Sequence, residues 1–226
     1  MITGETRLVG LLGDPVAQSL SPLMHNAAFA ARGLDWAYVP LPVAADRLEE
    51  AVRGLVALGL AGANVTTPHK LAAAKLVDTD EESINTLVVR NGRVFGSSTD
   101  AAILSELEFR HPAIVGDGGA AVAFAAVVPD APRFSRRGTW PPEVSDADLI
   151  LNATSVRDEV LFEVAPGQTL VDLPYPPTAT ARAAVAAGAR VVDGLDVLVA
   201  QGAASFETWT GVPAPVDVMR AAVRSA

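Results

Sequence analysis

Residues 113–119 read Ala-Ile-Val-Gly-Asp-Gly-Gly, a short apolar run followed by a glycine-rich turn, and the apolar residues 120–128 after it are typical of a helix. Strand, tight turn and helix form the repeating unit of parallel α/β proteins. The same alternation recurs along the chain. Further strands are predicted at residues 8–12, 36–41, 62–65, 148–152, 169–172 and 190–192. The sequence therefore predicts an α/β fold built on parallel sheets.

Helices are expected between several of these strands and after the last one. Ser21 is predicted to cap a helix whose first residue is Pro22 and which stops at Gly33. The turn residues Asn91-Gly92 predict a β-hairpin over 85–95. Other helices are expected over residues 44–58, 195–209 and 216–224, and after residues 70, 100 and 119, whereas Arg133–Ser145 is expected to be a loop.

Composition excludes several classes of function. The chain has 226 residues, half of them hydrophobic, and a net charge of −9, which disfavours binding to nucleic acids and to anionic membranes. It has no cysteine, and its three histidines lack metal-ligand spacing, so no metal site is expected. No signal-peptide pattern or membrane-length apolar run is present. We expect a cytoplasmic protein, monomeric or homodimeric, that acts on a small molecule.

Hydroxyl and amine side chains follow two of the predicted strands. Ser19 and Ser21 lie at a helix N-terminus, where two hydroxyls and free N–H groups suit a carboxylate; helix capping alone is the simpler interpretation. Thr66 and Lys70 follow the strand at 62–65, at the sheet edge where α/β proteins bind ligands. A lysine in a closed cleft can move a proton near neutral pH, although a lone lysine is more often a solvated surface residue.

Other polar and glycine-rich segments are compatible with a polyol and a nucleotide. Asn85 and Asp100 can both bind hydroxyl groups, but a turn residue and a helix cap explain them equally well. The glycines at 116–119 allow a diphosphate to approach the backbone at a helix N-terminus. Gln201 is polar within an apolar helix, so it is either paired in the core or faces a ligand.

The order of these motifs is more specific than any one of them. Along the chain come Ser-x-Ser-Pro (19–22), Asn-Val-Thr-x-Pro-x-Lys (64–70), Asn-Thr-Leu (85–87), Thr-Asp (99–100), Gly-x-Gly-Gly-Ala (116–120), Asn-Ala-Thr-Ser (152–155), Asp-x-x-Tyr-x-Pro-Thr (172–178) and Gln-Gly-Ala (201–203). In this succession the chain, from Leu8 to about Gly211, resembles the shikimate dehydrogenase family, which also includes enzymes acting on quinate.

The resemblance implies an N-terminal α/β domain at residues 1–98 that binds shikimate or 3-dehydroshikimate. It implies a shortened Rossmann-like NADP domain at 99–195 and C-terminal helices at 196–226 that return to the first domain. The implied activity is the NADPH-dependent, reversible reduction of 3-dehydroshikimate to shikimate, a step towards chorismate and the aromatic amino acids. By the same resemblance, Lys70 and Asp100 are the catalytic pair, and the substrate ligands are Ser19, Ser21, Thr66, Asn85, Tyr175 and Gln201.

The implied cofactor residues are Gly116, Gly118, Gly119, Ala120, Arg136, Asn152, Thr154 and Asp196. On this side the chain departs from the family pattern. Asp117 places a carboxylate in the phosphate loop, where it would repel a diphosphate. Ser135-Arg136-Arg137 replaces the family's Asn-Arg-Thr, and Asp196-Val197 replaces Gly-Met. Only residues 138–147 separate the arginines from the next strand, so a helix and a strand are expected to be missing.

Two hypotheses remain open at this point. The first is an active shikimate dehydrogenase with a trimmed nucleotide domain, using NADP because Arg136 and Arg137 suit a 2′-phosphate. The second is a shikimate-binding relative that has lost the cofactor and acts as a sensor or accessory protein. Both keep the predicted substrate residues, so binding of the dinucleotide distinguishes them. Preference for quinate or for NAD is a third, minor option.

Overall fold

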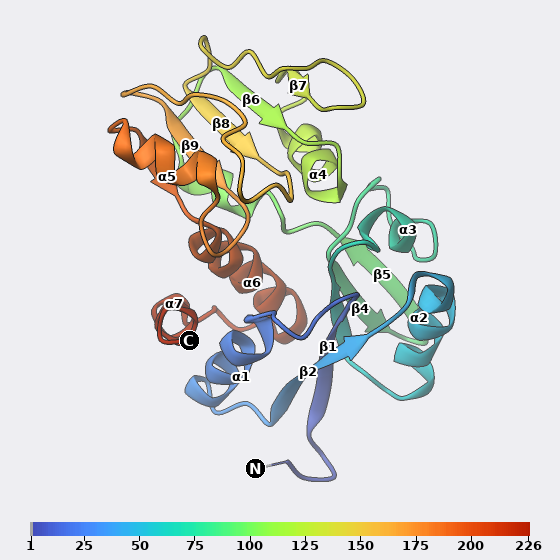
Figure 1. The fold of residues 1–226 in the computed structure, drawn as a ribbon. Coiled ribbons are helices and arrows are strands. Elements are labelled where there is room, and N and C mark those ends of the chain that lie inside the picture. The colour runs from blue at the N-terminus through green and yellow to red at the C-terminus, as the bar shows by residue number, and fades with distance from the viewer. Residues whose placement is uncertain (1) are drawn as a thin grey trace. The chain divides into compact units, whose positions relative to one another are not determined.

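The computed structural model describes residues 2–226, and the chain forms two compact units (Figure 1). The first contains the chain up to Thr99 together with Val199–Ala226, and the second contains Asp100–Leu198. Each unit has its own five-stranded sheet. The long helix α6 (Gly194–Thr210) begins in the second unit and continues through the first.

The sheet of the first unit has the strand order β2-β1-β3-β4-β5. Its strands are β1 (Arg7–Gly13), β2 (Trp36–Pro42), β3 (Gly62–Val65), β4 (Thr86–Arg90) and β5 (Arg93–Ser97). The first three are parallel, while β4 and β5 form an antiparallel hairpin. Its turn residues Asn91 and Gly92 have φ values of 51° and 74°, as the predicted two-residue hairpin turn requires.

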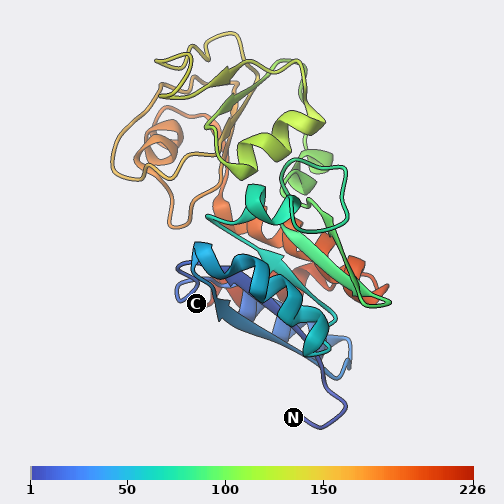
Figure 2. The same cartoon turned by 90° about the vertical axis from the view of Figure 1, so that its right-hand side faces the viewer.

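Helices cover both faces of this sheet, as Figures 1 and 2 show. Helix α2 (Leu48–Ala57), entered through a 3-10 turn at Ala45–Arg47, buries Val52 and Leu55 against one face. Helices α1 (Ser21–Ala31), α6 and α7 (Val216–Arg224) lie on the other, and α1 contacts α7. Helices thus bury the sheet from two sides, and its central strands β1 and β3 are accordingly largely apolar.

An aromatic cluster joins α1 and α6 to the sheet. His25 stacks on Tyr38 with ring centroids 4.6 Å apart, and Phe29 stacks on Phe206 at 5.3 Å. Trp209 donates from Nε1 to the Leu87 carbonyl at 2.9 Å. Only a glycine fits at position 62, because a Cβ there would clash with the Leu87 carbonyl oxygen and would lie 2.7 Å from the Trp209 indole nitrogen. Such ring pairs add about 0.5–1.5 kcal/mol each beyond their buried area.

The sheet of the second unit is parallel throughout, in the order β10-β9-β8-β6-β7. Its strands are β6 (Pro112–Val115), β7 (Arg133–Phe134), β8 (Leu149–Asn152), β9 (Thr169–Asp172) and β10 (Arg190–Val192). From β6 the chain passes through α4 (Gly119–Val127) to β7 on one side and then continues with β8 on the other. This reversal between β6 and β8 is the switch point at which doubly wound sheets bind nucleotides.

Two crossovers of this sheet lack a helix among the described residues. The segment from β7 to β8 is irregular and contributes Val144 to the core, with Trp140 packed against it. The segment from β8 to β9 contributes Leu161, Phe162 and Val164. Buried loop side chains take the place of helices on this face. The expected absence of a helix and a strand before β8 thus agrees with the described structure.

The structure corrects several predictions of detail. Ser21 is not the cap of α1: Leu20 occupies that position, Ser21 is the first helical residue, and the cap residue makes no side-chain hydrogen bond. The predicted loop at Arg133–Ser145 is wrong for its first two residues, which pair with β6 as β7. Helix α5 (Ala179–Ala186) was not predicted, because its start is masked by the prolines before it. The segment after Asp100 forms a 3-10 helix, Ala102–Glu106. None of the described helices combines the length and hydropathy needed to cross a membrane.

Candidate active site

Strand directions bring most of the predicted substrate residues to one edge of the first sheet. Strands β1 and β3 are parallel, so both end there. Asn64 near the end of β3 pairs with Thr86 at the start of β4, and Thr86 pairs with Ser97 at the end of β5. Segments leaving β1, β3 and β5 and the segment entering β4 therefore meet at this edge. They carry Ser19, Ser21, Thr66, Lys70 and Asn85.

The two serines lie at the start of α1. Ser19 Oγ accepts a hydrogen bond of 3.2 Å from the Ser21 backbone N–H, and Ser21 is buried. The helix is fixed to the sheet by Asn26, whose amide donates to the Tyr38 carbonyl and accepts from its N–H, at 2.9 and 2.8 Å. Because β2 is an edge strand, this amide replaces a neighbouring strand for Tyr38. Sequence reasoning did not single out Asn26.

Thr66 and Lys70 flank a turn that is fixed by a buried histidine. The Thr66 methyl group packs against Gly13, where a Cβ would approach it to 2.3 Å. His69 is buried, and its Nε2 is 2.7 Å from the Val43 carbonyl oxygen. Lys70 is the first residue of α3 (Lys70–Ala74) and is half-buried. The contacts of Thr66 and His69 therefore hold this turn against the sheet, and Lys70 follows it at the carboxyl edge of β3.

Asn85 and Gln201 are brought together, although 116 positions separate them in sequence. Asn85 Nδ2 donates to Gln201 Oε1 at 3.1 Å, and Asn85 Oδ1 accepts from the backbone N–H and hydroxyl of Thr99, at 2.8 and 3.1 Å. The backbone N–H can only donate, which fixes the orientation of the Asn85 amide. A hydrogen bond from Gln201 to a ligand would then come from Nε2, a donor suited to a hydroxyl or carbonyl oxygen.

A buried polar network supports these two amides. Ser205 Oγ lies 2.8 Å from Thr86 Oγ1 and 3.1 Å from Thr99 Oγ1, and it accepts from Asn64 Nδ2 at 3.0 Å. Asn64 Oδ1 in turn accepts from the Tyr38 hydroxyl at 2.9 Å. Satisfied buried networks of this kind hold side chains in one arrangement. Sequence reasoning missed Ser205, yet its spacing of four residues from Gln201 places both on one face of α6.

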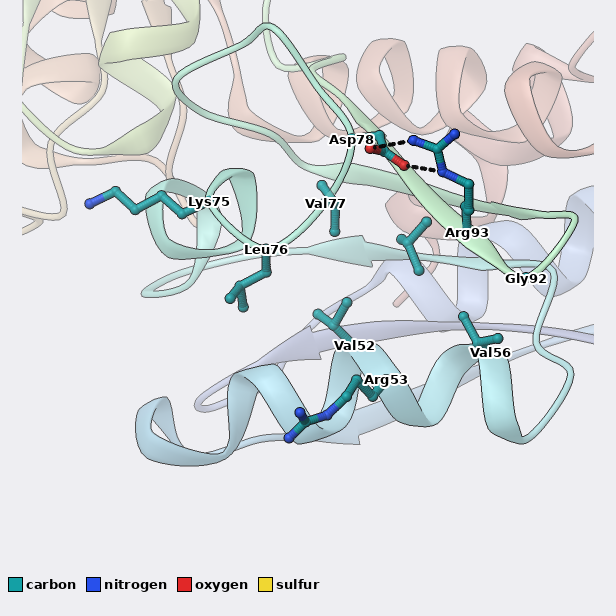
Figure 3. Close-up of a pocket in the computed structure, with 10 residues that line it drawn as sticks. Val52, Arg53, Val56, Lys75, Leu76, Val77, Asp78, Gly92 and Arg93 are labelled. Atoms are coloured by element: carbon teal, nitrogen blue, oxygen red, sulfur yellow. Dashed lines mark hydrogen bonds and ion pairs between the residues drawn. The ribbon is translucent and has the colours of Figure 1, made fainter.

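A surface hollow of about 460 Å³ in the first unit lies apart from these residues (Figure 3). It lies between α2 and the β4–β5 hairpin, with Val52, Val56 and Val77 on its walls. Beside it Arg93 holds Asp78 through two hydrogen bonds of 2.9 and 2.8 Å. None of the predicted site residues lines this hollow, so we do not assign the substrate to it.

The second unit presents a glycine-rich loop between β6 and α4. Gly116 has a φ of 134°, and a Cβ there would lie 2.8 Å from the Ala153 carbonyl oxygen, so only glycine fits. Gly118 precedes α4 with an extended backbone, and no heavy atom lies within 4 Å of where its Cβ would be. Gly116 is thus packed against the neighbouring strand end, whereas Gly118, at the N-terminus of α4, faces open space. An open helix N-terminus of this kind suits a diphosphate. Gly119 and Ala120 are the first residues of α4.

Charged side chains surround this loop in two ion pairs. Asp117 Oδ2 lies 3.5 Å from Arg137 Nη1, so the carboxylate has a cationic partner in the loop after β7. Arg136 Nη2 lies 2.7 Å from Glu159 Oε2, and its guanidinium is 5.4 Å from the centre of the Trp140 ring. All four charged side chains are well exposed. The predicted repulsion by Asp117 is thus partly offset within the unit.

The motifs after β8 and β9 form one buried hydrogen-bond system. Asn152 donates to Asp172 at 2.7 Å, and its Oδ1 accepts from the Thr154 hydroxyl at 2.8 Å. Asp172 also accepts from the backbone N–H and hydroxyl of Thr178, both at 3.0 Å, and Thr178 caps α5. The loop 173–177, which carries Tyr175, is therefore closed at its base. Asn152 serves as an internal support for this loop and for Thr154.

Two further predicted residues belong to the second unit. Asp196 lies in the first turn of α6 and donates from its backbone N–H to Asp193 Oδ1 at 3.0 Å, while Asp193 also accepts from Leu195. Asp100 opens the unit, directly after the Thr99 that binds Asn85. Among residues 2–226 no group of three His, Cys, Asp or Glu side chains is arranged to hold a metal ion.

Taken together, these observations define an α/β protein with a cluster of polar side chains at one sheet edge of its first unit and, in its second, a doubly wound parallel sheet of the kind that binds dinucleotides. Family models for the shikimate dehydrogenase substrate binding domain and the shikimate 5'-dehydrogenase C-terminal domain match residues 11–87 and 194–224. The chain belongs to the shikimate dehydrogenase family.

Relatives named shikimate dehydrogenase (NADP(+)) match almost the whole chain. The protein of Citrifermentans bemidjiense is 37% identical over 279 aligned positions, covering 98% of this chain and 96% of the relative. That of Anaeromyxobacter dehalogenans is 40% identical over 272 positions, covering 98% and 97%. The first alignment is 53 positions longer than the 226 residues of this chain. The chain is therefore shortened relative to this relative.

Solved structures agree with this assignment. The shikimate dehydrogenase of Aquifex aeolicus has a TM-score of 0.90 and 29% identity, covering 99% of this chain and 100% of that one. The shikimate 5-dehydrogenase of Thermus thermophilus, solved with NADP(H) and shikimate, has a TM-score of 0.85 and 29% identity, covering 97% and 99%. The Rossmann-like fold predicted from the sequence is confirmed.

Proposed function

We propose that this chain is an NADP-dependent shikimate dehydrogenase, which reversibly reduces 3-dehydroshikimate to shikimate. The observation that carries this proposal is the similarity of 98% of the chain to relatives named for that activity and cofactor. The reaction is a step towards chorismate and the aromatic amino acids, and we place it in the cytoplasm, where NADPH is available. No specific observation favours the alternative of a binder that has lost its cofactor.

We assign substrate binding to the first unit. A cluster of hydroxyl, amide and ammonium donors at one sheet edge suits a polyhydroxy acid, because each oxygen of the ligand needs a partner once water is removed. Ser19 and Ser21, at the start of α1, would hold the carboxylate. Thr66, Asn85 and Gln201 would bind the ring oxygens, and Tyr175 is the further substrate ligand that the family resemblance implies.

We assign proton transfer to Lys70 and Asp100. When bound, NADPH supplies a hydride to the ketone carbon of the substrate. The oxygen at that carbon then takes a proton, and a lysine ammonium is a suitable donor. We pair this lysine with the carboxylate of Asp100, as the family resemblance implies. Thr99 is hydrogen-bonded to Asn85 through its backbone N–H and its hydroxyl. These hydrogen bonds hold the backbone just before Asp100.

Residues 100–198 would hold the cofactor. The diphosphate would lie on the loop formed by Gly116, Gly118, Gly119 and Ala120. Arg136 would bind the 2′-phosphate. Thr154, which is hydrogen-bonded to Asn152, and Asp196 would be the remaining cofactor residues. The domains implied by the family resemblance, residues 1–98 for the substrate, 99–195 for NADP and 196–226 for the C-terminal helices, differ slightly from the two compact units, whose boundaries follow Thr99 and Leu198.

Calorimetric titration with shikimate and with NADP, each alone, tests the proposal. We expect saturable binding of both ligands by the purified chain. Binding of shikimate without any binding of NADP would contradict it and would select the cofactor-free alternative. Tighter binding of NAD than of NADP would show that the chain uses NAD. Tighter binding of quinate than of shikimate would show that its substrate is quinate.

A further inference from the structure

Arg136, one of the residues we assign to the cofactor, is paired with an acidic side chain that no sequence motif explains, Glu159. Arg136 comes two residues after the end of β7 and 20 residues after Gly116, the spacing at which dinucleotide-binding folds read the ribose 2′ position. An acidic residue at this position favours the 2′-hydroxyl of NAD, and an arginine favours the 2′-phosphate of NADP. Here the arginine is already paired, because Glu159 Oε2 lies 2.7 Å from its Nη2.

Glu159 reaches Arg136 from the opposite side of the phosphate loop. Strand β6 lies between β7 and β8, and all three strands are parallel. Arg136 belongs to the segment after β7, and Glu159 belongs to the segment after β8. The ion pair therefore connects the two segments that flank β6 at its carboxyl edge. A nucleotide held by the loop after β6 would have to lie beside this pair.

The charges in the pair are matched to a phosphate. The guanidinium of Arg136 packs near the Trp140 ring, which orients its planar donors. A guanidinium binds carboxylates and phosphates through the same fork of N–H groups, so the two anions compete for one face. Glu159 and Arg136 are each more than half exposed, so the carboxylate is displaced at low energetic cost.

We propose that Glu159 is a specificity-determining residue, whose carboxylate occupies Arg136 in competition with the 2′-phosphate of NADP. This inference rests on the proposed use of NADP by the second unit. Glu159 weakens the binding of ligands that carry a 2′-phosphate and leaves the binding of NAD unchanged, because NAD has no group that needs Arg136. The carboxylate thereby reduces the ratio of NADP affinity to NAD affinity.

Binding measurements on Glu159→Gln test this inference, with Glu163→Gln as control, an exposed carboxylate of the same segment. Four ligands are titrated: NADP, NAD, adenosine 2′,5′-bisphosphate and 5′-AMP. We expect Glu159→Gln to tighten NADP and the bisphosphate by about twofold to fivefold, the range for an exposed ion pair. NAD and 5′-AMP should bind as they do to the unaltered chain, and Glu163→Gln should change none of the four.

Three results would overturn the inference. Equal tightening of NAD and NADP would show a general charge effect. Unchanged or weaker NADP binding in Glu159→Gln would show that Glu159 does not compete, or that it positions Arg136. A similar gain in Glu163→Gln would remove the dependence on this ion pair. If the unaltered chain and Glu159→Gln both bind none of the four ligands, the proposed function fails together with the inference, whereas the first three results leave it intact.

Discussion

At the scale of single residues, two kinds of side chain meet at the candidate site. Some, such as Asn85, have hydrogen-bond partners that hold them in one orientation, and one, Lys70, follows a turn that is held by a buried histidine. Asn85 has its amide orientation set by the Thr99 backbone, and His69 anchors the turn before Lys70. A proton donor needs a defined position as well as a suitable pKa, because misplacement of about 1 Å lowers the rate strongly. The rigidity of the surrounding backbone is therefore part of the chemistry assigned to Lys70.

Replacing Lys70 with alanine should abolish most of the turnover. We expect Lys70→Ala to lower kcat by about 10²–10⁴-fold, because general acid catalysis contributes that much, while shikimate still binds. Steady-state kinetics and calorimetry measure the two effects. Lys75→Ala, an exposed lysine just past α3, is the matched control and should behave as the unaltered chain. Unchanged kcat in Lys70→Ala would remove this residue from the mechanism.

Replacing Asp117 should tighten both nicotinamide cofactors. Asp117→Ala removes a carboxylate from the phosphate loop and releases Arg137 for an anion. We expect Kd to fall by about twofold to fivefold for NAD and NADP alike, since both carry the diphosphate. Titration at two salt concentrations measures the change, which should shrink at high salt. Weaker binding would mean that the Asp117–Arg137 pair organises the loop instead of opposing the ligand.

At the scale of elements, two kinds of interaction hold helix α1 against the sheet. One is the aromatic stack of His25 on Tyr38, and the other is the Asn26 amide on the Tyr38 backbone. Both fix the N-terminus of α1, where Ser19 and Ser21 lie. The sequence predicted this helix and its end at Gly33, but the contacts that position it depend on a strand more than ten residues away and on α6, so no local pattern could reveal them.

The Asn26 amide should contribute measurably to stability. Asn26→Ala leaves the Tyr38 N–H and carbonyl at the sheet edge without this partner, so we expect the free energy of unfolding to fall by about 1–3 kcal/mol. Urea denaturation measures it. Asn26→Asp keeps the acceptor but turns a carboxylate oxygen towards the Pro22 and Tyr38 carbonyl oxygens, so it should be no more stable than Asn26→Ala. Equal stability of all three proteins would show that water replaces the amide at no cost.

Burial lowers the pKa of His25 from 6.5 to about 3, because its ring is enclosed by aromatic side chains. Neither ring nitrogen has a hydrogen-bond partner in the described structure. The unfolded chain therefore binds a proton that the folded chain refuses between these pH values, and stability is lost as pH falls from 6.5 towards 3. At about 1.4 kcal/mol per pKa unit the loss reaches on the order of 5 kcal/mol.

His25→Phe should remove this part of the pH dependence. We expect the variant to lose less stability than the unaltered chain between pH 6.5 and the acid limit, as measured by urea unfolding at several pH values. A slope in His25→Phe equal to that of the unaltered chain would show that His25 is not the group responsible.

At the scale of the whole molecule, the sequence predicted the α/β class, the family and nearly all strands. The strands were found because each is a short apolar run closed by glycine, proline or a polar turn. Strand β7 was missed because it has only two residues, and α5 because its cap, Thr178, follows three prolines in five residues. Both elements are stabilised mainly by neighbours that are distant in sequence.

The candidate site was predictable in part. Gln201 was predicted to be paired in the core or to face a ligand, because a polar residue in an apolar helix needs a partner. Asn85 was predicted as a hydroxyl ligand or a turn residue, and its hydrogen bond to Gln201 was not predicted. The partners themselves, Ser205 above all, and the ion pairs of Arg136 and Arg137 depend on three-dimensional packing. Those contacts also support a cofactor site despite the shortened second unit, since its phosphate loop is retained and the charge of Asp117 is offset.

The most direct test of the central claim is turnover by the purified chain. NADPH is mixed with 3-dehydroshikimate, and the loss of NADPH absorbance is followed alongside the formation of shikimate. The account predicts one shikimate formed for each NADPH consumed, no reaction when the ketone is omitted, and a slower reaction with NADH. Shikimate binding with no consumption of NADPH at any concentration would contradict it.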